Sequence, residues 1–287
     1  MEPSDQQSPQ LDRQIVLNHS VNPSVTGDLR LHEFPSRIFR NTRWLRVWLP
    51  PNYDAPENSA RHYPVFYLND GQNLFDRTVA FGGNEWGVDE TADILIREQK
   101  IPPMIIVGID NTGVDRIKEY LPYRSFSPRV LRPQGKNYPD FLIHEVMAFV
   151  HARYRLASGP ENTGLGGSSL GGLISLYTAM ERPGIFGRLL IESPSLFISG
   201  RKILKEIRHV RHWPERVYLG IGTRESGRED KDRQFVQDLQ ALERVMRHTG
   251  LDDAHLKVWL EEGANHSESS WGNRFPEALT FLFAPTS

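Results

Sequence analysis

The sequence predicts an α/β fold in three layers, with a mostly parallel central sheet and helices on both of its faces. Short runs rich in Val, Ile and Leu alternate with longer amphipathic segments, which is the order expected of parallel strands joined by crossover helices. Several of these runs are almost continuously apolar, as expected for strands that are buried on both faces. With 287 residues and 38% hydrophobic content, the chain can bury one large core.

Seven runs are predicted to be strands, because apolar, β-branched and aromatic residues are concentrated in them between turn-forming residues. In chain order they are RWLRVWL (43–49), PVFYLN (64–69), PMIIVGID (103–110), NTGLGGSS (162–169), GRLLIES (187–193), RVYLGIG (216–222) and LKVWLE (256–261).

Six segments between and after these strands are predicted to be helices. They cover residues 86–98, 139–153, 170–182, 200–211, 230–249 and 272–284. The Pro-rich stretch 121–138 is predicted to be a long loop, a kind of segment that often carries binding residues. Residues 1–26 are polar and are predicted to form a loose N-terminal segment, followed by a single domain over residues 27–287.

The charge balance and composition exclude several classes of function. The 34 basic and 36 acidic side chains leave a net charge of −2, so no field of one sign favours nucleic acid or an anionic membrane as a partner. The absence of cysteine excludes disulfides, thiolate catalysis and Cys-ligated zinc. There is no secretory signal pattern and no apolar run of 18 residues, so we expect a cytoplasmic protein.

The stretch GLGGSSLGGL (164–173) lies where a predicted strand meets a predicted helix. In the nucleophile elbow G-x-S-x-G, the turn is so tight that the residues two before and two after the serine must lack bulk. Around Ser169 these residues are Gly167 and Gly171, whereas around Ser168 one of them would be Leu170. The pattern therefore favours Ser169 as a nucleophile over an incidental serine in a Gly-rich turn.

A serine nucleophile needs a base, and in α/β hydrolases the chain order is serine, acid, histidine. The histidines that follow the elbow are His209, His212, His248, His255 and His266. Of these, His266 comes just after the last predicted strand, in the loop EEGANHSESSWG. This places it at the carboxyl end of the sheet, where sites of open α/β sheets lie.

The acid is expected after the strand at 216–222. The candidates in GTRESGREDKD are Glu225, Glu229, Asp230 and Asp232. Glu225 is favoured because it comes first after the strand, whereas Asp230 and Asp232 are suited to open the next helix.

An oxyanion needs backbone N–H donors. The N–H of Leu170 would supply one of them at the N-terminus of the helix after Ser169. The second is expected from the loop after the strand at 64–69, where Asp70-Gly71 permits a sharp turn and Gln72 follows. A plain Asp-Gly turn is the alternative.

Taken together, YPVFYLNDGQNLFD, GGSSLGG, GIGTRE and GANHSESSW resemble the esterase family of α/β hydrolases, over roughly residues 40–284. That family includes enterochelin (siderophore) esterases, feruloyl and acetyl-xylan esterases, S-formylglutathione hydrolases and mycolyltransferases. The resemblance implies an α/β-hydrolase fold with Ser169 as nucleophile, His266 as base and Glu225 as acid, and with Gln72 and Leu170 as oxyanion donors. Related members often have Asp at the place of Glu225.

Further residues are expected to line the substrate pocket. The expected polar contacts are Asp70, Asn111, Arg116 and Tyr120, and the expected apolar walls are Trp86 and Trp271. The alternatives are that Arg116 pairs with Asp115 or Glu119 on the surface, and that Trp86 belongs to the core. Because HxH and HExxH spacings are absent, no metal and no cofactor are expected.

These observations favour a serine carboxylesterase that acts on a small-molecule ester, for example a siderophore, a carbohydrate-linked or an aryl ester. An acyltransferase with the same machinery is a second hypothesis, and product analysis with an added alcohol would distinguish it. A non-catalytic carbohydrate-binding protein on a hydrolase fold and a serine peptidase are further alternatives. The sequence does not indicate an oligomeric state.

Overall fold

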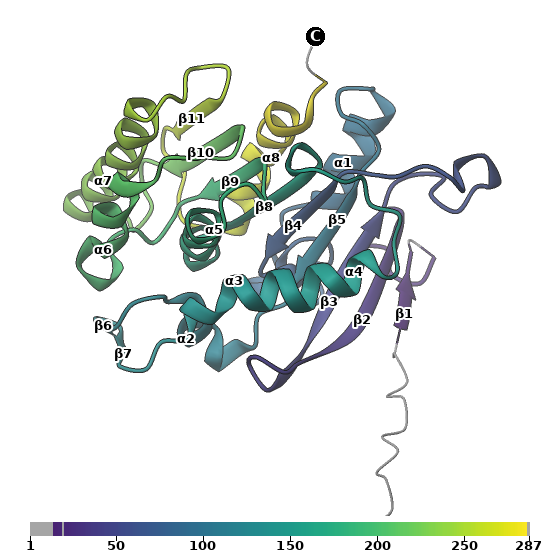
Figure 1. Cartoon of the computed structure of the whole chain (residues 1–287), viewed down its shortest axis with the longest axis horizontal. Helices are drawn as coiled ribbons and strands as arrows, with labels where there is room; N and C mark the ends of the chain where they lie inside the picture. The colour runs from purple at the N-terminus through teal and green to yellow at the C-terminus, as the bar shows by residue number, and fades with distance from the viewer. Residues whose placement is uncertain (1–13, 19, 286–287) are drawn as a thin grey trace, which may run out of the picture.

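A nine-stranded sheet runs through the computed structural model, which describes residues 14–18 and 20–285 (Figure 1). The strand order is β1-β2-β3-β5-β4-β8-β9-β10-β11. The strands are β1 (Gln14–Leu17), β2 (Asp28–Ser36), β3 (Asn41–Leu49), β4 (Val65–Asn69), β5 (Ile105–Ile109), β8 (Thr163–Ser168), β9 (Arg188–Glu192), β10 (Arg216–Gly222) and β11 (Leu256–Glu261). From β5 to β11 the neighbours are parallel, whereas β1, β2 and β3 add to this edge as antiparallel strands.

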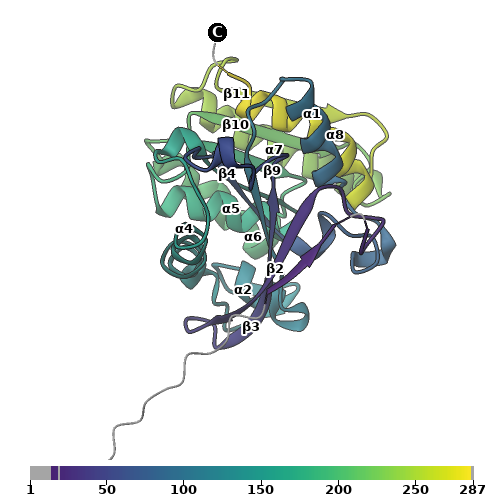
Figure 2. The same ribbon diagram turned by 90° about the vertical axis from the view of Figure 1, so that its right-hand side faces the viewer.

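Helices cover both faces of this sheet, as Figure 2 shows from the side. The helices are α1 (Val88–Arg97), α2 (Arg116–Tyr120), α3 (Tyr138–Asp140), α4 (Ala148–His151), α5 (Leu170–Glu181), α6 (Ile198–Glu206), α7 (Glu229–His248) and α8 (Glu268–Phe283). A π-helical stretch, Phe141–Met147, joins α3 to α4. The mostly parallel sheet with helices on both faces is that of an α/β-hydrolase fold, as expected.

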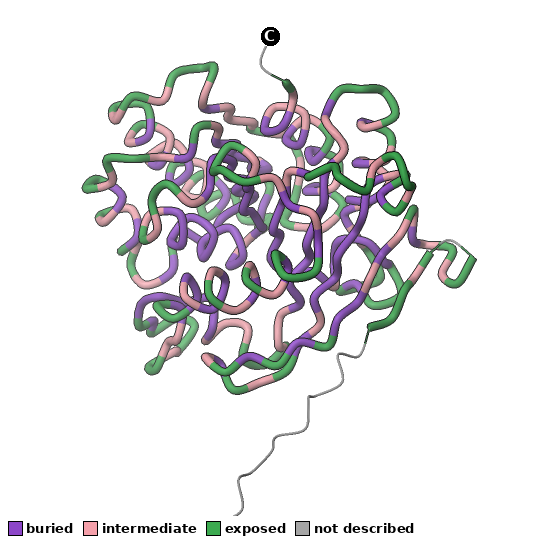
Figure 3. Tube along the Cα trace, turned by 45° about the vertical axis from the view of Figure 1, so that its right-hand side comes forward, coloured by how far each residue is buried: buried purple, intermediate pink, exposed green. Residues whose placement is uncertain are grey.

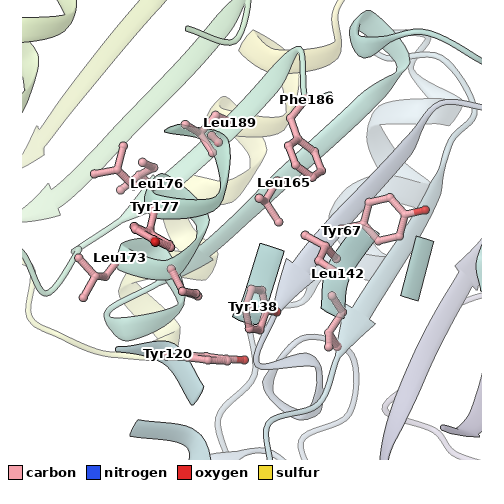
Figure 4. Close-up of a cluster of buried hydrophobic side chains, with 14 of the residues drawn as sticks. Tyr67, Tyr120, Tyr138, Leu142, Leu165, Leu173, Leu176, Tyr177, Phe186 and Leu189 are labelled. Carbon is pink, nitrogen blue, oxygen red and sulfur yellow. The ribbon is translucent and has the colours of Figure 1, made fainter. Parts of the chain in front are cut away.

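The core has two halves, one on each face of the sheet, because side chains alternate along each strand. Val65 and Tyr67 of β4 point into a cluster with α5, α7 and the α3–α4 helix, part of which is drawn in Figure 4. Phe66 and Leu68 of the same strand point to the opposite face and pack with α1 and α8. The central strands are consequently buried along most of their length (Figure 3).

The N-terminal part of the chain differs from the expectation of a loose segment over residues 1–26. Gln14–Leu17 pairs antiparallel with β2, Val25 is fully buried, and the side chains of Asn22 and Ser24 donate hydrogen bonds to Asp76. These contacts attach the segment to the domain from residue 14 onward. Residues 1–13 lie outside the described part of the chain.

The predicted long loop at 121–138 contains more structure than expected. It carries a two-stranded hairpin of β6 (Ser125–Phe126) and β7 (Arg129–Val130), which projects beside α6 in Figure 1. The last helix also begins earlier than the predicted residue 272. It starts at Glu268 because Ser267 accepts a hydrogen bond from the N–H of Ser270 and so caps the first turn.

A buried acid holds the N-terminal segment against α1. Asp89 is fully buried in the first turn of this helix, and one of its carboxylate oxygens accepts the Thr26 N–H at 2.6 Å. Burial, together with charge repulsion and hydrogen bonding from the neighbouring Glu90, raises the pKa of Asp89 to about 9. Asp89 is therefore protonated in the folded protein at neutral pH.

Replacing Asp89 by Asn is expected to stabilise the protein at alkaline pH. Between the ordinary Asp pKa of about 4 and the raised value, the folded state binds a proton that the unfolded state has released, so stability falls as pH rises. Asn keeps the neutral shape and removes this dependence. At pH 9 we expect a gain of at least about 1 kcal/mol, or roughly 2–4 °C in Tm.

The measurement is thermal unfolding of Asp89→Asn and of the wild type from pH 5 to pH 9. The exposed Asp115, changed to Asn, is the matched control and should follow the wild type at every pH. A difference between Asp89→Asn and the wild type that does not grow with pH would contradict the assignment.

Candidate active site

Ser169 is the one residue between β8, which ends at Ser168, and α5, which begins at Leu170. Its backbone has φ 57° and ψ −120°. The turn is closed by glycines that cannot be replaced without movement. A Cβ on Gly167 would lie 2.9 Å from the carbonyl carbon of Gly171, and a Cβ on Gly171 would lie 2.9 Å from Oδ2 of Asp70. A hydrogen bond of 2.9 Å from the Ser169 N–H to the Glu192 carbonyl fixes the turn to β9. Ser169 is half-buried, whereas Ser168 is buried at the end of β8.

Next to this turn, two backbone N–H groups have no hydrogen-bond acceptor in the described part of the chain. The N–H of Leu170, the first residue of α5, has no acceptor among the residues that the structure describes, and neither has the N–H of Gln72. Asp70 adopts a left-handed conformation at φ 60°, which turns the chain into the 3₁₀ turn Gly71–Asn73. The close approach of Gly171 to Asp70 brings the two segments together, so the arrangement can present two donors to one negative oxygen.

Glu225 and His266 form a hydrogen-bonded pair. Oε2 of Glu225 lies 2.5 Å from Nδ1 of His266, and Oε1 accepts hydrogen bonds from the Ser193 hydroxyl and the Gly222 N–H, each at 2.7 Å. The Glu225 side chain is 2% exposed, and that of His266 is 36% exposed. A buried carboxylate is thus joined to an imidazole that solvent can reach.

The other acids considered in this loop are engaged elsewhere. Asp232 accepts hydrogen bonds from the N–H and the hydroxyl of Ser226, both at 2.7 Å, near the start of α7. Asp230 and Glu229 are exposed and pair with Arg228 and Arg233 respectively. Of the four candidates, Glu225 is the one that contacts His266.

The Ser169 hydroxyl makes no hydrogen bond to His266 in this structure. Among the described residues its hydrogen-bond partner is Oγ of Ser195, at 3.3 Å, and the Ser195 N–H also donates to the Ser169 carbonyl at 3.1 Å. Sequence reasoning missed Ser195. Its position shortly after β9, at the carboxyl edge of the sheet, was the available signal.

Arg116 pairs with Asp70, and not with Asp115 or Glu119. Its Nε and one terminal nitrogen lie 2.6 and 2.7 Å from the two oxygens of Asp70. The Asn111 side chain donates to the same carboxylate at 2.7 Å, and the Asn111 N–H donates to the side-chain oxygen of Gln72 at 3.2 Å. This network fixes the loop that carries the Gln72 N–H.

Three of the residues expected to line the pocket lie in the core, which corrects that expectation. Tyr120 is fully buried, with its ring at 5.4 Å from that of Tyr138. Trp86 and Trp271 are each 5% exposed and pack against one another, with their ring centroids 5.9 Å apart. Trp271 nevertheless contacts residues of the site. Its ring lies edge-on to that of His266, with the centroids 4.9 Å apart, and its Nε1 donates to the Ser193 hydroxyl at 2.9 Å.

A buried ion pair next to the site joins Arg274 of α8 to Glu192 of β9. Nε and one terminal nitrogen of Arg274 donate to Glu192 at 2.9 and 2.8 Å, and the other terminal nitrogen donates to Glu261 at 2.6 Å. Burial, with a smaller contribution from the charge of Glu225, raises the pKa of Glu192 to about 7 against the opposing effect of Arg274. Arg274 thus holds Glu192 at the end of β9, and the carbonyl of Glu192 accepts the Ser169 N–H.

In the described residues, no group of three or more His, Asp and Glu side chains is placed to hold a metal ion. None of the helices within residues 14–18 and 20–285 combines the length and hydropathy needed to cross a bilayer.

Comparison with known proteins relates nearly the whole chain to esterases. Residues 36–282 match the family model described as "Putative esterase". Protein YbbA of Bacillus subtilis is 24% identical over 265 residues, which are 90% of this chain and 97% of YbbA.

Solved structures share the fold. The enterobactin esterase FES of Shigella flexneri superposes with a TM-score of 0.66 at 18% identity, over 96% of this chain and 60% of that enzyme, so this chain spans less than two thirds of it. An IroE-like serine hydrolase of Shewanella oneidensis superposes with a TM-score of 0.69 at 19% identity, over 89% of this chain and 80% of that protein.

Proposed function

The chain belongs to the Putative esterase family, and on that premise we propose that it is a serine esterase in which Ser169, His266 and Glu225 form a catalytic triad. The observation that carries the proposal is the buried Glu225 carboxylate, which holds Nδ1 of His266 at 2.5 Å. This contact leaves Nε2 as the proton acceptor of a neutral imidazole, the tautomer that a serine nucleophile requires.

In the proposed reaction, the Ser169 hydroxyl attacks the ester carbonyl while Nε2 of His266 takes its proton. The carbonyl oxygen becomes negative and is bound by the N–H groups of Gln72 and Leu170, which have no other acceptor among the described residues. Collapse of this intermediate breaks the bond to the alcohol, which leaves with the proton from His266. Water, deprotonated by His266, then attacks the acyl-enzyme, and the acid is released.

The reaction requires the Ser169 hydroxyl to turn from Ser195 to His266. Catalytic hydrogen bonds are often loose in ligand-free enzymes and tighten when substrate binds. Rotation about the Cα–Cβ bond of Ser169 releases its hydroxyl from Ser195, while the Ser169 N–H keeps its hydrogen bond to the Glu192 carbonyl.

The substrate we propose is a small-molecule ester of the siderophore, carbohydrate-linked or aryl type. Support comes from the family and from the structural neighbours, among them an enterobactin esterase and a ferulic acid esterase. The Arg116–Asp70 pair beside Gln72 leaves Arg116 partly exposed, so a polar group near the scissile bond could contact it.

The test is hydrolysis of p-nitrophenyl acetate and butyrate, combined with labelling by a fluorophosphonate. We expect turnover with a burst of p-nitrophenol close to one equivalent of enzyme, because an acyl-enzyme accumulates. We also expect one fluorophosphonate adduct, mapped by mass spectrometry to Ser169, and loss of activity in step with labelling. An inert wild type, or an adduct on Ser168 or Ser195, would contradict the proposal.

A further inference from the structure

We propose that Ser193 is a positioning residue for the Glu225–His266 pair and that Trp271 fixes the Ser193 hydroxyl in that role. This inference rests on the proposed function, because it concerns how the acid and the base of the triad are held. The Ser193 hydroxyl contacts Glu225 and the Trp271 ring contacts His266, so both residues act through the acid and the base.

Ser193 is placed by the end of β9. It is buried and has φ 41°, a left-handed conformation that is unfavourable for a residue with a side chain. Its N–H donates to the carbonyl of Gly220 in β10 at 2.7 Å, which keeps this conformation in place. Strained backbone of this kind persists where the surroundings impose it, and here it directs the hydroxyl toward Glu225.

The Ser193 hydroxyl is used both as donor and as acceptor. It donates to Oε1 of Glu225 at 2.7 Å and accepts the Nε1–H of Trp271 at 2.9 Å. Because the indole nitrogen can only donate, it orients the single hydroxyl proton of Ser193 toward the carboxylate.

The Ser193 hydroxyl, directed in this way, fixes the orientation of the Glu225 carboxylate. With the Ser193 hydroxyl and the Gly222 N–H both on Oε1, the carboxylate cannot rotate, and Oε2 remains for Nδ1 of His266. A carboxylate that is fixed in this way keeps the imidazole in one tautomer and one orientation.

Trp271 supports the same pair from the other side. Its ring lies edge-on to that of His266, with the centroids 4.9 Å apart and the planes at 86°. One indole, on the first turns of α8, therefore limits the tilt of the base and sets the direction of the hydroxyl that holds the acid.

The first experiment is Ser193→Ala, assayed with p-nitrophenyl butyrate. We expect kcat to fall about tenfold with KM close to that of the wild type, since the loss concerns the orientation of the base and not substrate binding.

Ser36→Ala is the matched control. Ser36 is also buried and its hydroxyl donates to a glutamate, Oε2 of Glu145, at 2.6 Å, but at the end of β2. We expect this variant to lose stability while keeping the kcat and KM of the wild type.

The second experiment is a double-mutant cycle with Trp271→Phe. Phe keeps an aromatic edge against His266 but removes the Nε1–H, so it should lower kcat a fewfold. Because both residues act through the Ser193 hydroxyl, the double variant should be about as slow as Ser193→Ala alone. Trp48 lies in β3, and Trp48→Phe removes its indole hydrogen bond to the Thr26 carbonyl; this control should leave kcat unchanged.

Ser193→Ala with an unchanged kcat, or with a KM that rises as much as kcat falls, would overturn the inference. Fully additive effects of Ser193→Ala and Trp271→Phe would also overturn it. Failure of the proposed function has a different result: Ser169 then carries no fluorophosphonate adduct, and its removal leaves activity intact. Activity that depends on Ser169 but not on Ser193 rejects the inference alone.

Discussion

Replacing Ser169 by Ala is expected to lower kcat for p-nitrophenyl esters by about 10⁴-fold or more, because no other described hydroxyl stands on the turn beside two unpaired N–H groups. The residual rate would come from binding and from these N–H donors. His266→Ala should lose a similar factor, and the double variant should be no slower than either single one, because the two groups act as a unit.

The measurement is steady-state hydrolysis by highly purified variants, with thermal unfolding to show that the fold is intact. Ser168→Ala is the control, since Ser168 precedes the turn, is buried in β8 and should not affect kcat beyond a fewfold. A Ser169→Ala variant that keeps a rate within tenfold of the wild type would remove the basis of the triad.

Replacing Glu225 by Gln is expected to lower kcat by about 10³- to 10⁴-fold. Gln has the same shape but carries no charge, and its NH₂ group can donate to Nδ1 of His266. The imidazole would then carry its proton on Nε2, where it cannot accept the proton of Ser169. The charge that stabilises the imidazolium during the reaction is also lost.

The comparison that tests this prediction is Glu225→Gln against Asp232→Asn. Asp232 is the other buried acid of the same segment, but it binds Ser226 and not His266. Its replacement should affect stability near the start of α7 while kcat stays within a fewfold of the wild type. If instead Asp232→Asn were the slower enzyme, the role of Glu225 would be refuted.

Much of the fold could be predicted because the strands of the parallel part of the sheet, apart from the edge strand β11, are buried on both faces. All seven predicted strands occur, since continuous apolar runs such as that of β5 are compatible with little else. β2 was not predicted, because its sequence DLRLHEFPS mixes charged residues and a proline into the strand. The period-two alternation of Leu29 and Leu31 with polar residues was the signal that could have found it.

The short strand β1 could not be predicted from its own four residues. Ile15 and Val16 remain exposed, so burial does not mark the segment, and it becomes a strand by pairing with β2. An edge strand of this kind depends on a neighbour whose position is set elsewhere in the chain.

The sequence by itself determined the elements whose cause is local. Apolar runs specify the buried strands, and Gly167 and Gly171 single out Ser169 as the residue on the tight turn, because steric fit within five residues decides this. The position of His266 after the last strand follows from strand order alone.

Only the tertiary structure decided which groups meet at the site. It joins Glu225, and not Asp230 or Asp232, to His266, and it pairs Arg116 with Asp70 across 46 residues of chain. It also places Tyr120, Trp86 and Trp271 in the core. Ser193 contacts Glu225 and Ser195 contacts Ser169, so two further serines belong to the site. These contacts depend on strand register and helix packing between distant segments, and no local pattern of residue types records them.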